Sequence, residues 1–269
     1  MRCQPRDEAQ VYICLKNVQS CLLCDEPAEA EVPICVACET DLPWLGDHCQ
    51  TCALPLPSAG LTCGGCLLEP PAFEQVVVPW RYDFPVDSLI TRFKHNAKWP
   101  FGHLLADVAG QYLQHRFDEG LPRPDALLPV PLAGKRLRQR GFNQAAMLGR
   151  WLSQQLDLPF EEHALRRIHD TSAQQDLDAK ARKHNLRHAF ALTPDAKVKG
   201  RHFALIDDVL TTGATAQALA RLLRDAGAAR VDVYCLARTP KPGNRKSAQF
   251  HCGSGLAREE ACTFSIFGD

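Results

Sequence analysis

The chain has 269 residues, of which 45% are hydrophobic, and its formal net charge is zero. That apolar content is enough for a buried core, which excludes an intrinsically disordered protein. No apolar run reaches the length of a membrane span and the first 20 residues lack the apolar stretch of a secretory signal, so we expect a cytoplasmic protein without membrane contact.

Charge is distributed unevenly along the chain. Residues 20–80 contain nine acidic residues and no lysine or arginine, whereas residues 81–269 carry a net charge of +8. This shift predicts two modules of opposite sign. We expect the following division: an N-terminal arm at 1–20, a double zinc ribbon at 21–70, an α/β domain at 71–239 and an irregular tail at 240–269.

Eight of the 13 cysteines form four Cys-x-x-Cys pairs in the acidic module. Two intervening residues let one turn present both thiolates to a metal ion, and two such turns complete a tetrahedral zinc site. Each pair starts 14 residues after the previous one, so spacing alone does not decide which pairs share an ion. Sequential pairing is simplest because it leaves no pair unmatched. The expected ligands of two structural zinc ions are Cys21, Cys24, Cys35, Cys38, Cys49, Cys52, Cys63 and Cys66.

The alternatives to zinc are a disulfide framework and a redox pair. The expected reducing compartment argues against the first, and four equal pairs argue against the second. Zinc ribbons often bind nucleic acid, but a module with nine acidic and no basic side chains repels phosphate. We therefore expect this module to contact a protein partner or the basic remainder of its own chain.

The rest of the chain alternates between short apolar runs and amphipathic segments, which predicts a parallel sheet flanked by helices. A β-branched run at 76–80 opens this domain. In chain order we then expect helices near 86–95 and 102–117, a strand at 126–132, a helix at 141–156, a polar and basic stretch at 166–188, a strand at 202–207, a helix at 214–226 closed by Gly227, and a strand at 230–237.

The stretch ALIDDVLTTGAT at 204–215 joins the end of a buried strand to two aspartates, hydroxyl residues and a glycine. Ligands of a parallel sheet bind beyond the carboxyl ends of its strands. Backbone N–H groups at the start of the next helix suit a phosphate monoester, while carboxylates suit the hydroxyls of a ribose. The stretch predicts a ribose 5-phosphate site, with the sugar at Asp207 and Asp208 and the phosphate at Thr211, Thr212, Gly213, Ala214 and Thr215.

The string ALIDDVLTTG closely resembles the phosphoribosyl pyrophosphate (PRPP) motif of type I phosphoribosyltransferases. The chain also carries LLPVPL, RGFNQA at 140–145 and a spaced set comprising Thr171, Gln174, Leu177, Arg182, Asn185 and the pair at 189–190. Together with the cysteine pairs, these motifs resemble the ComF family, which includes competence proteins, over residues 21 to about 239. The tail at 240–269 does not match that pattern.

The resemblance implies a type I phosphoribosyltransferase fold and the places where PRPP and Mg²⁺ bind. It places a pyrophosphate loop after the first central strand, at Val130, Pro131, Leu132, Arg136 and Arg140. It places a loop that closes over PRPP within 166–188, with the candidates Arg166, Thr171, Gln174, Arg182 and Asn185. The residues that it implies for catalysis are Asp207, Asp208, Arg166 and Arg182.

Two classes of function compete. The first is Mg²⁺-dependent transfer of a phosphoribosyl group from PRPP to a nitrogenous acceptor. The second is a binding protein without turnover that senses PRPP or a ribonucleotide, or that holds single-stranded DNA during natural competence. The net charge of +8 over residues 81–269 favours contact with DNA, whereas no interleaved aromatic run of the kind used by single-strand binders is visible. A third possibility is that the acidic module docks a basic, helicase-like partner.

Overall fold

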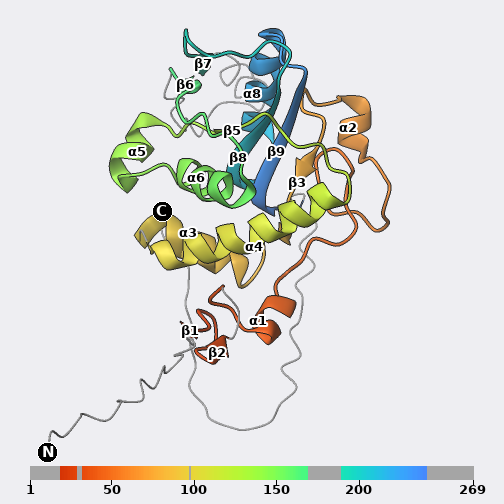
Figure 1. Cartoon of the computed structure of the whole chain (residues 1–269). Coiled ribbons are helices and arrows are strands. Elements are labelled where there is room, and N and C mark those ends of the chain that lie inside the picture. The colour runs from red at the N-terminus through yellow and green to blue at the C-terminus, as the bar shows by residue number, and fades with distance from the viewer. Residues whose placement is uncertain (1–18, 29–31, 97, 169–188, 241–269) are drawn as a thin grey trace, which may run out of the picture.

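The computed structural model describes residues 19–28, 32–96, 98–168 and 189–240. These residues form an α/β core with two small cysteine-rich units attached to it (Figure 1). Four candidates from the expected PRPP-closing loop, Thr171, Gln174, Arg182 and Asn185, lie outside the described residues. Among the helices that are described, none is long and apolar enough to cross a membrane.

The centre of the fold is a five-stranded sheet in which every pairing is parallel. Its order is β3-β9-β8-β5, and β4 pairs with β9 next to β3. The strands are β3 (Val76–Val77), β4 (Trp80–Arg81), β5 (Ala126–Pro129), β8 (His202–Leu210) and β9 (Arg230–Arg238). The parallel sheet predicted from the alternation of strands and helices is therefore confirmed.

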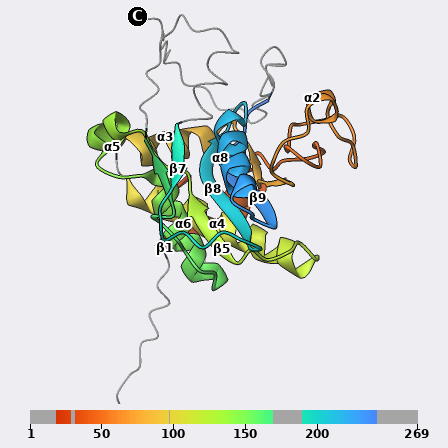
Figure 2. The ribbon, with the colours of Figure 1, turned by 90° about the horizontal axis from the view of Figure 1, so that it is seen from above.

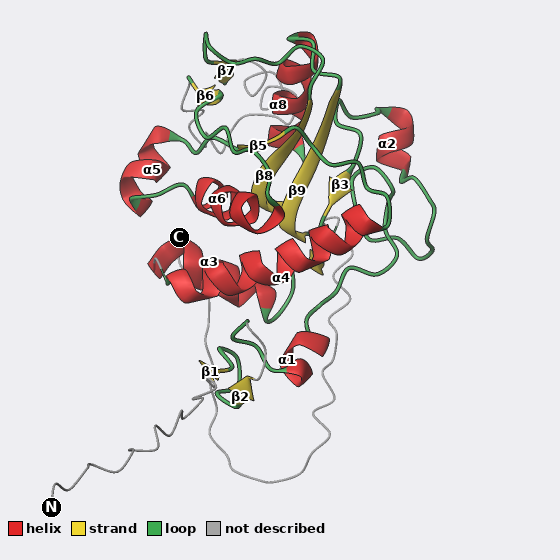
Figure 3. Cartoon of the chain, in the orientation of Figure 1, coloured by secondary structure: helices red, strands yellow, loops and turns green. Residues whose placement is uncertain are grey.

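Helices cover both faces of this sheet (Figures 2 and 3). One face packs against α3 (Val86–Asn96), α4 (Trp99–Asp118) and α6 (Gln144–Leu156), and the other packs against α8 (Ala214–Asp225). Leu104, Leu105 and Val108 of α4 are buried, as their helical spacing predicts. Gly227, at φ +93°, follows the last turn of α8 and ends it as expected.

The segment between β5 and α6 differs from the expected strand and helix. The strand ends at Pro129, and α5 (Gly134–Arg140) forms a separate short helix. Gly141 adopts φ +78° and stops α5, and the Asn143 side chain caps α6 by accepting from the Ala145 N–H at 3.1 Å. The single helix predicted over 141–156 is thus wrong at its start.

The second expected strand is longer than predicted. β8 does not stop at Asp207 but continues to Leu210, because β9 keeps pairing with it as far as Arg238. Both aspartates therefore lie within the strand rather than beyond it. A further small ladder, which the sequence did not predict, pairs β6 (Leu165–Arg167) with β7 (Phe190–Leu192) in antiparallel fashion.

The cysteine-rich region forms two units on different sides of the core (Figure 1). The first cysteine unit (residues 21–38) packs against the α4 face of the sheet. The second cysteine unit (residues 49–66) lies beside the edge formed by β3 and β4. The short elements of this region are β1 (Gln19–Ser20), β2 (Pro27–Ala28), α1 (Val36–Thr40) and α2 (Gly64–Leu68).

The chain between the two units runs along the outer edge of the sheet. Trp44 forms an antiparallel bridge with Trp80 of β4, and their rings lie 5.8 Å apart. The Leu45 N–H donates to Pro79 O at 2.7 Å, and the Val76 N–H donates to Thr51 O at 2.9 Å. The acidic module therefore does contact the rest of its own chain, through backbone pairing and apolar packing at the sheet edge.

Candidate functional site at the end of strand β8

The carboxyl end of β8 leads directly into the first turn of α8. Thr211 and Thr212 are exposed, and Gly213 adopts φ +76°, a left-handed conformation that glycine reaches without strain. The Thr212 hydroxyl accepts from the Ala214 N–H at 3.4 Å. Ala214 and Thr215 begin α8, so their backbone N–H groups lie at the helix N-terminus, where an anion is favoured.

Asp207 and Asp208 are adjacent residues of β8, and their carboxyl groups lie close enough to interact with each other and with Lys94. Each carboxylate accepts from the next backbone N–H: Asp208 N donates to Asp207 Oδ1 at 2.9 Å, and Val209 N donates to Asp208 Oδ1 at 2.7 Å. Burial raises the pKa of Asp207 well above its ordinary value, and the neighbouring charge of Asp208 raises it further. Negative charge on Asp207 is therefore costly at this site, and the surroundings favour its protonated form.

Lys94 of α3 reaches this acidic pair from the helical layer. Its Nζ lies 2.7 Å from Asp208 Oδ2, and the two side chains are only 18% and 7% exposed. The same ammonium group lowers the pKa of Asp207, although burial outweighs it. A lysine more than 100 residues away in the sequence therefore belongs to the site.

Arg238, at the end of β9, lies beneath the start of the β8–α8 loop (residues 211–213). Its guanidinium donates to Leu210 O at 3.0 Å and to Thr211 O at 2.5 Å, and the residue is 6% exposed. It also donates to Thr239 O at 2.9 Å and to Cys52 O at 2.9 Å. A buried cation therefore fixes the backbone carbonyl groups at the start of this loop.

The β5–α5 segment (residues 130–140) lies on the neighbouring strand. The Val130 N–H donates to Ile206 O at 2.9 Å, just before the aspartate pair, and Val130 O accepts from the Asn143 side chain at 3.0 Å. Pro131 and Leu132 are half-buried, Arg136 is exposed and Arg140 is half-buried. This segment is therefore brought to the same edge of the sheet as Asp207, as expected for neighbouring parallel strands.

Arg166 lies outside the central sheet, in the two-stranded ladder of β6 and β7. It is an exposed residue of β6, paired with Ala191 of β7, at the start of the stretch that runs into residues 169–188. The other arginine candidate, Arg182, falls outside the described residues, so the expected PRPP-closing loop is described only over residues 166–168.

The eight paired cysteines form two clusters. One contains Cys21, Cys24, Cys35 and Cys38, the other Cys49, Cys52, Cys63 and Cys66, and within each the Sγ atoms all lie within 4.8 Å of one another. This is the sequential pairing. The Cys24–Cys35 and Cys52–Cys63 sulfur atoms are 3.6 Å apart, close to the roughly 3.8 Å expected between thiolates around one tetrahedral Zn²⁺.

Backbone N–H groups support the thiolate form at both clusters. The Cys63 N–H donates to Cys49 Sγ at 3.2 Å, and the Leu23 N–H donates to Cys21 Sγ at 3.5 Å. Burial alone would raise the pKa of Cys49, but backbone hydrogen bonds lower it to about 6. The donor set, its spacing and its charge all fit zinc, which would hold each unit together where little apolar surface is buried.

Two protein-family models match different parts of the chain. Residues 18–67 match a double zinc ribbon domain model, and residues 143–259 match a phosphoribosyl transferase domain model. The chain is 37% identical to the DNA utilization protein YhgH of Salmonella typhi over 172 residues, which cover 64% of this chain and 75% of that protein. It is also 37% identical to competence protein F of Haemophilus influenzae, covering 62% of this chain and 74% of that protein.

The chain belongs to the ComF family. A more distant relative, competence protein ComFC of Bacillus subtilis, is 35% identical over 114 residues, covering 42% of this chain and 44% of the relative. Among solved structures, a purine phosphoribosyltransferase from Pyrococcus horikoshii is 17% identical with a TM-score of 0.33, covering 51% of this chain and 84% of the other.

Within this ComF family protein, the sequence motifs account for part of the site only. Lys94 and Arg238 were not singled out from the sequence, nor was Asn143 as the residue that joins Val130 to α6. Arg238 ends an alternating strand, and Lys94 sits in an ordinary amphipathic helix, so neither carries a local signal. The one available signal was the pair of adjacent aspartates at the end of a buried strand, because buried carboxylates need a cation nearby.

Proposed function

We propose that this protein binds PRPP at the carboxyl end of β8, together with Mg²⁺, and transfers its phosphoribosyl group to a nitrogenous acceptor. The 5′-phosphate binds the β8–α8 loop and the first turn of α8. The ribose hydroxyls bind Asp207 and Asp208. In the transfer, the bond between ribose C1 and pyrophosphate breaks, pyrophosphate leaves with the electron pair, and the acceptor nitrogen bonds to C1 and gives up its proton.

The observation that carries this proposal is the Lys94–Asp208 pair beside an anion-binding helix terminus. A single site offers backbone N–H groups and a left-handed glycine for a phosphate, and carboxylates for a diol. The lysine adds a cation where the pyrophosphate of bound PRPP would lie next to the sugar. Val130, Pro131, Leu132, Arg136 and Arg140 supply the pyrophosphate side. Arg166 and Arg182 stay candidates for catalysis, and Arg182 lies outside the described residues.

Mg²⁺ suits this arrangement because its preferred ligands are carboxylate and phosphate oxygens. When bound it supplies charge neutralisation for the departing pyrophosphate. Asp207 is the residue of this chain that would hold it, since Asp208 is already paired with Lys94. The remaining work of orienting the sugar and excluding water belongs to the protein.

Calorimetry tests the proposal directly. PRPP is titrated with and without Mg²⁺ into the wild type and into Asp207→Asn/Asp208→Asn. We expect binding that needs Mg²⁺ and is lost in the double variant, and equal heats for both proteins would reject the site. Release of pyrophosphate over a panel of bases and amines separates transfer from sensing, because binding without release leaves a PRPP or ribonucleotide sensor.

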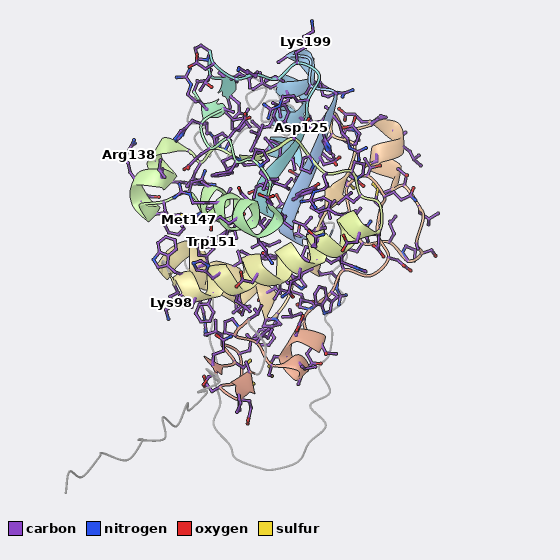
Figure 4. All side chains as sticks on the ribbon, viewed as in Figure 1. Lys98, Asp125, Arg138, Met147, Trp151 and Lys199 are labelled. Atoms are coloured by element: carbon purple, nitrogen blue, oxygen red, sulfur yellow. The ribbon has the colours of Figure 1, made fainter. Side chains whose placement is uncertain are left out.

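A second candidate function, binding of single-stranded DNA, is favoured by a specific feature of the surface. Trp99, Phe142 and Trp151 gather from different segments, with the Trp99 and Phe142 rings 4.8 Å apart and Trp99 39% exposed. The sequence shows no interleaved aromatic run, and these three rings come together only in the fold, in an aromatic cluster that is a candidate surface for base stacking. Phe142 of this cluster comes two residues after the basic helix α5. Arg138 of α5 and Lys98 project on the same side of the molecule (Figure 4).

Base stacking on aromatic rings beside a cationic track is how proteins hold single strands without reading their sequence. The names of the relatives, DNA utilization and competence proteins, agree with such a role. The test is the salt dependence of single-strand affinity. We expect a steep dependence that lessens in Arg136→Ala/Arg138→Ala, and weaker binding in Trp99→Ala. Affinity that ignores salt would reject this candidate.

The acidic cysteine units remain candidates for docking a basic protein partner. The nine acidic residues are spread over residues 20–80, and the apolar residues Leu67 and Leu68 of α2 are exposed. Pull-down of a basic, helicase-like protein by the wild type, but not by a variant with Leu67→Ser/Leu68→Ser, would support that role.

A further inference from the structure

The buried guanidinium of Arg238 joins the second cysteine unit to the β8–α8 loop. It donates through Nε to Cys52 O at 2.9 Å, and through Nη1 to Leu210 O at 3.0 Å and Thr211 O at 2.5 Å. Cys52 is one of the four cysteines clustered in that unit, while Leu210 and Thr211 are the last residue of β8 and the first of the loop. One side chain therefore spans two segments separated by about 160 residues of sequence.

A buried cation needs its acceptors in place. Arg238 is 6% exposed, and its guanidinium donates to main-chain carbonyl oxygens rather than to a carboxylate among the described residues. A guanidinium that loses such an acceptor away from water keeps the full cost of its desolvation. The position of the Cys52 carbonyl therefore matters to the position of the loop carbonyls that share the same guanidinium.

Cys52 is fixed in turn by its own cluster. Its Sγ lies 3.6 Å from Cys63 Sγ, and the Cys63 N–H donates to Cys49 Sγ. The second cysteine unit holds one five-residue helix and buries little apolar surface of its own. A unit of this kind depends on its metal for a defined shape. The metal therefore sets where the Cys52 carbonyl lies.

A second link runs between the same two parts of the molecule. The Ala72 N–H, in the segment after the second cysteine unit, donates to Gln217 Oε1 in the first turn of α8 at 2.8 Å. Gln217 in turn donates its backbone N–H to Gly213 O at 2.8 Å. The cysteine-rich side therefore contacts the start of the loop through Arg238, and the first turn of α8, which follows the loop, through Ala72.

The first cysteine unit provides an internal comparison. It packs with Trp80 and with α4, on the face of the sheet opposite α8 (Figure 1). Among the described residues, its backbone hydrogen bonds stay within residues 19–41, such as the Leu22 N–H to Pro33 O bond at 3.0 Å. Loss of its metal removes a similar amount of structure without touching the β8–α8 loop.

We propose that the metal site of the second cysteine unit controls the shape of the β8–α8 loop, with Arg238 as the positioning residue between them. The inference about the loop stands on these contacts. Its consequence for ligand affinity rests on the proposed function, in which this loop binds the 5′-phosphate of PRPP. Binding of the sugar phosphate is then coupled to the zinc content of one unit and not of the other.

The test compares Cys63→Ser/Cys66→Ser with the matched control Cys35→Ser/Cys38→Ser. Zinc content is measured by elemental analysis, and amide hydrogen exchange is followed at Gln217 and Thr239, whose N–H groups donate to Gly213 O and Leu210 O. Exchange at Leu127, on the far strand β5, reports global stability. We expect each variant to lose one zinc, and only the first to speed exchange at Gln217 and Thr239 relative to Leu127, by about tenfold.

Arg238→Met tests the link without disturbing either metal site. We expect Arg238→Met to retain both zinc ions and to speed exchange at Gln217 and Thr239, as Cys63→Ser/Cys66→Ser does. If the cysteine variant fails to fold, Arg238→Met alone still provides the test. A merely structural role would raise exchange at Leu127 equally. Unchanged exchange at Gln217 and Thr239 in Arg238→Met, or equal exchange in the two cysteine variants, overturns the proposal.

Calorimetry with ribose 5-phosphate separates this inference from the proposed function. We expect about tenfold weaker binding in Arg238→Met than in the wild type, the effect of losing one charge-assisted hydrogen bond near the ligand. A wild type that does not bind ribose 5-phosphate rejects the proposed function, while the exchange data still decide whether zinc controls the loop. Equal affinity in the two proteins, with looser exchange, rejects the coupling to ligand.

Discussion

Lys94 Nζ lies 2.7 Å from Asp208 Oδ2, so a helix of the covering layer delivers a cation to the strand that carries the proposed ribose site. The contact joins α3 to the carboxyl end of β8. It neutralises one of two adjacent carboxylates in a place that water reaches poorly. The affinity of this site for a cationic or anionic ligand therefore depends on a residue that no local motif contains.

Removal of Lys94 should destabilise the fold. In Lys94→Met the carboxylate of Asp208, only 7% exposed, loses its partner, and we expect the free energy of unfolding to fall by about 3 kcal/mol. Urea denaturation measures the loss. Asp208→Asn in the same background should restore most of it, and Lys98→Met, which removes an exposed lysine nearby, should change little. A double variant as unstable as Lys94→Met would contradict the role of the ion pair.

Mg²⁺ should compete with Lys94 for the acidic pair. Without the ammonium group, the two carboxylates present more negative charge, so we expect Lys94→Met to bind Mg²⁺ at least about tenfold more tightly than the wild type. Thermal unfolding measured over a range of Mg²⁺ concentrations reports the difference through ligand-linked stabilisation. Equal Mg²⁺ dependence in the two proteins would show that the cation and the lysine do not share a site.

Asp207 should make the fold less stable as pH rises. Burial and the charge of Asp208 raise its pKa in the folded protein, so the folded state keeps a proton that the unfolded chain has already released. The free energy of unfolding therefore decreases from about pH 3.8, the ordinary carboxyl value, up through the raised pKa. Asp207→Asn lacks this loss and should be more stable than the wild type at neutral pH.

Urea denaturation of the wild type and Asp207→Asn at several pH values isolates the contribution of Asp207 and its interaction with Asp208, since ionisable groups far from this pair titrate equally in both proteins. Asp225→Asn, at the exposed end of α8, serves as the control and should keep the wild-type slope. A stability difference between wild type and Asp207→Asn that does not grow with pH would contradict the assignment.

Gly213 should matter for binding as well as for folding. An added Cβ meets no protein atom within 4 Å, but φ of +76° strains any other residue, so Gly213→Ala should cost about 1–2 kcal/mol of stability. Gly120, after α4, has φ +100° and equally open surroundings, so Gly120→Ala should cost about as much. Calorimetry should then show weaker ribose 5-phosphate binding in Gly213→Ala alone.

The two cysteine clusters should bind zinc independently. Elemental analysis should give about two zinc ions per chain for the wild type and about one for Cys24→Ser. Cys235→Ala, which removes a buried cysteine outside both clusters, should keep two. A single zinc ion in the wild type would mean that one cluster is not a metal site.

Much of the fold follows from local patterns in the sequence. The strands β8 and β9 are apolar runs flanked by turn residues, and α8 ends at a glycine, so periodicity and capping locate them. The grouping of the cysteines into two clusters follows from their order along the chain. These features depend on neighbours in sequence, which is why the sequence is enough to predict them.

The rest depends on contacts between distant segments. Whether Asp208 would be paired, and by which of many lysines and arginines, is decided by how α3 packs on the sheet. The short helix α5 was not predicted, because it spans only seven residues and Gly141, which ends it, was expected to begin the next helix. The aromatic cluster is equally invisible in sequence, since Trp99, Phe142 and Trp151 meet only once α4 and α6 pack together.

The chain between the two cysteine units closes the open edge of the sheet. Trp44 bridges Trp80, Leu45 donates to Pro79 O, and Thr51 accepts from Val76, so the outer hydrogen-bonding groups of β3 and β4 are already used. An uncovered strand edge is a template on which a second chain can add a strand. We therefore expect the zinc ribbon region to protect this edge from pairing with a second chain, and metal-depleted protein to aggregate more readily than the zinc-loaded protein.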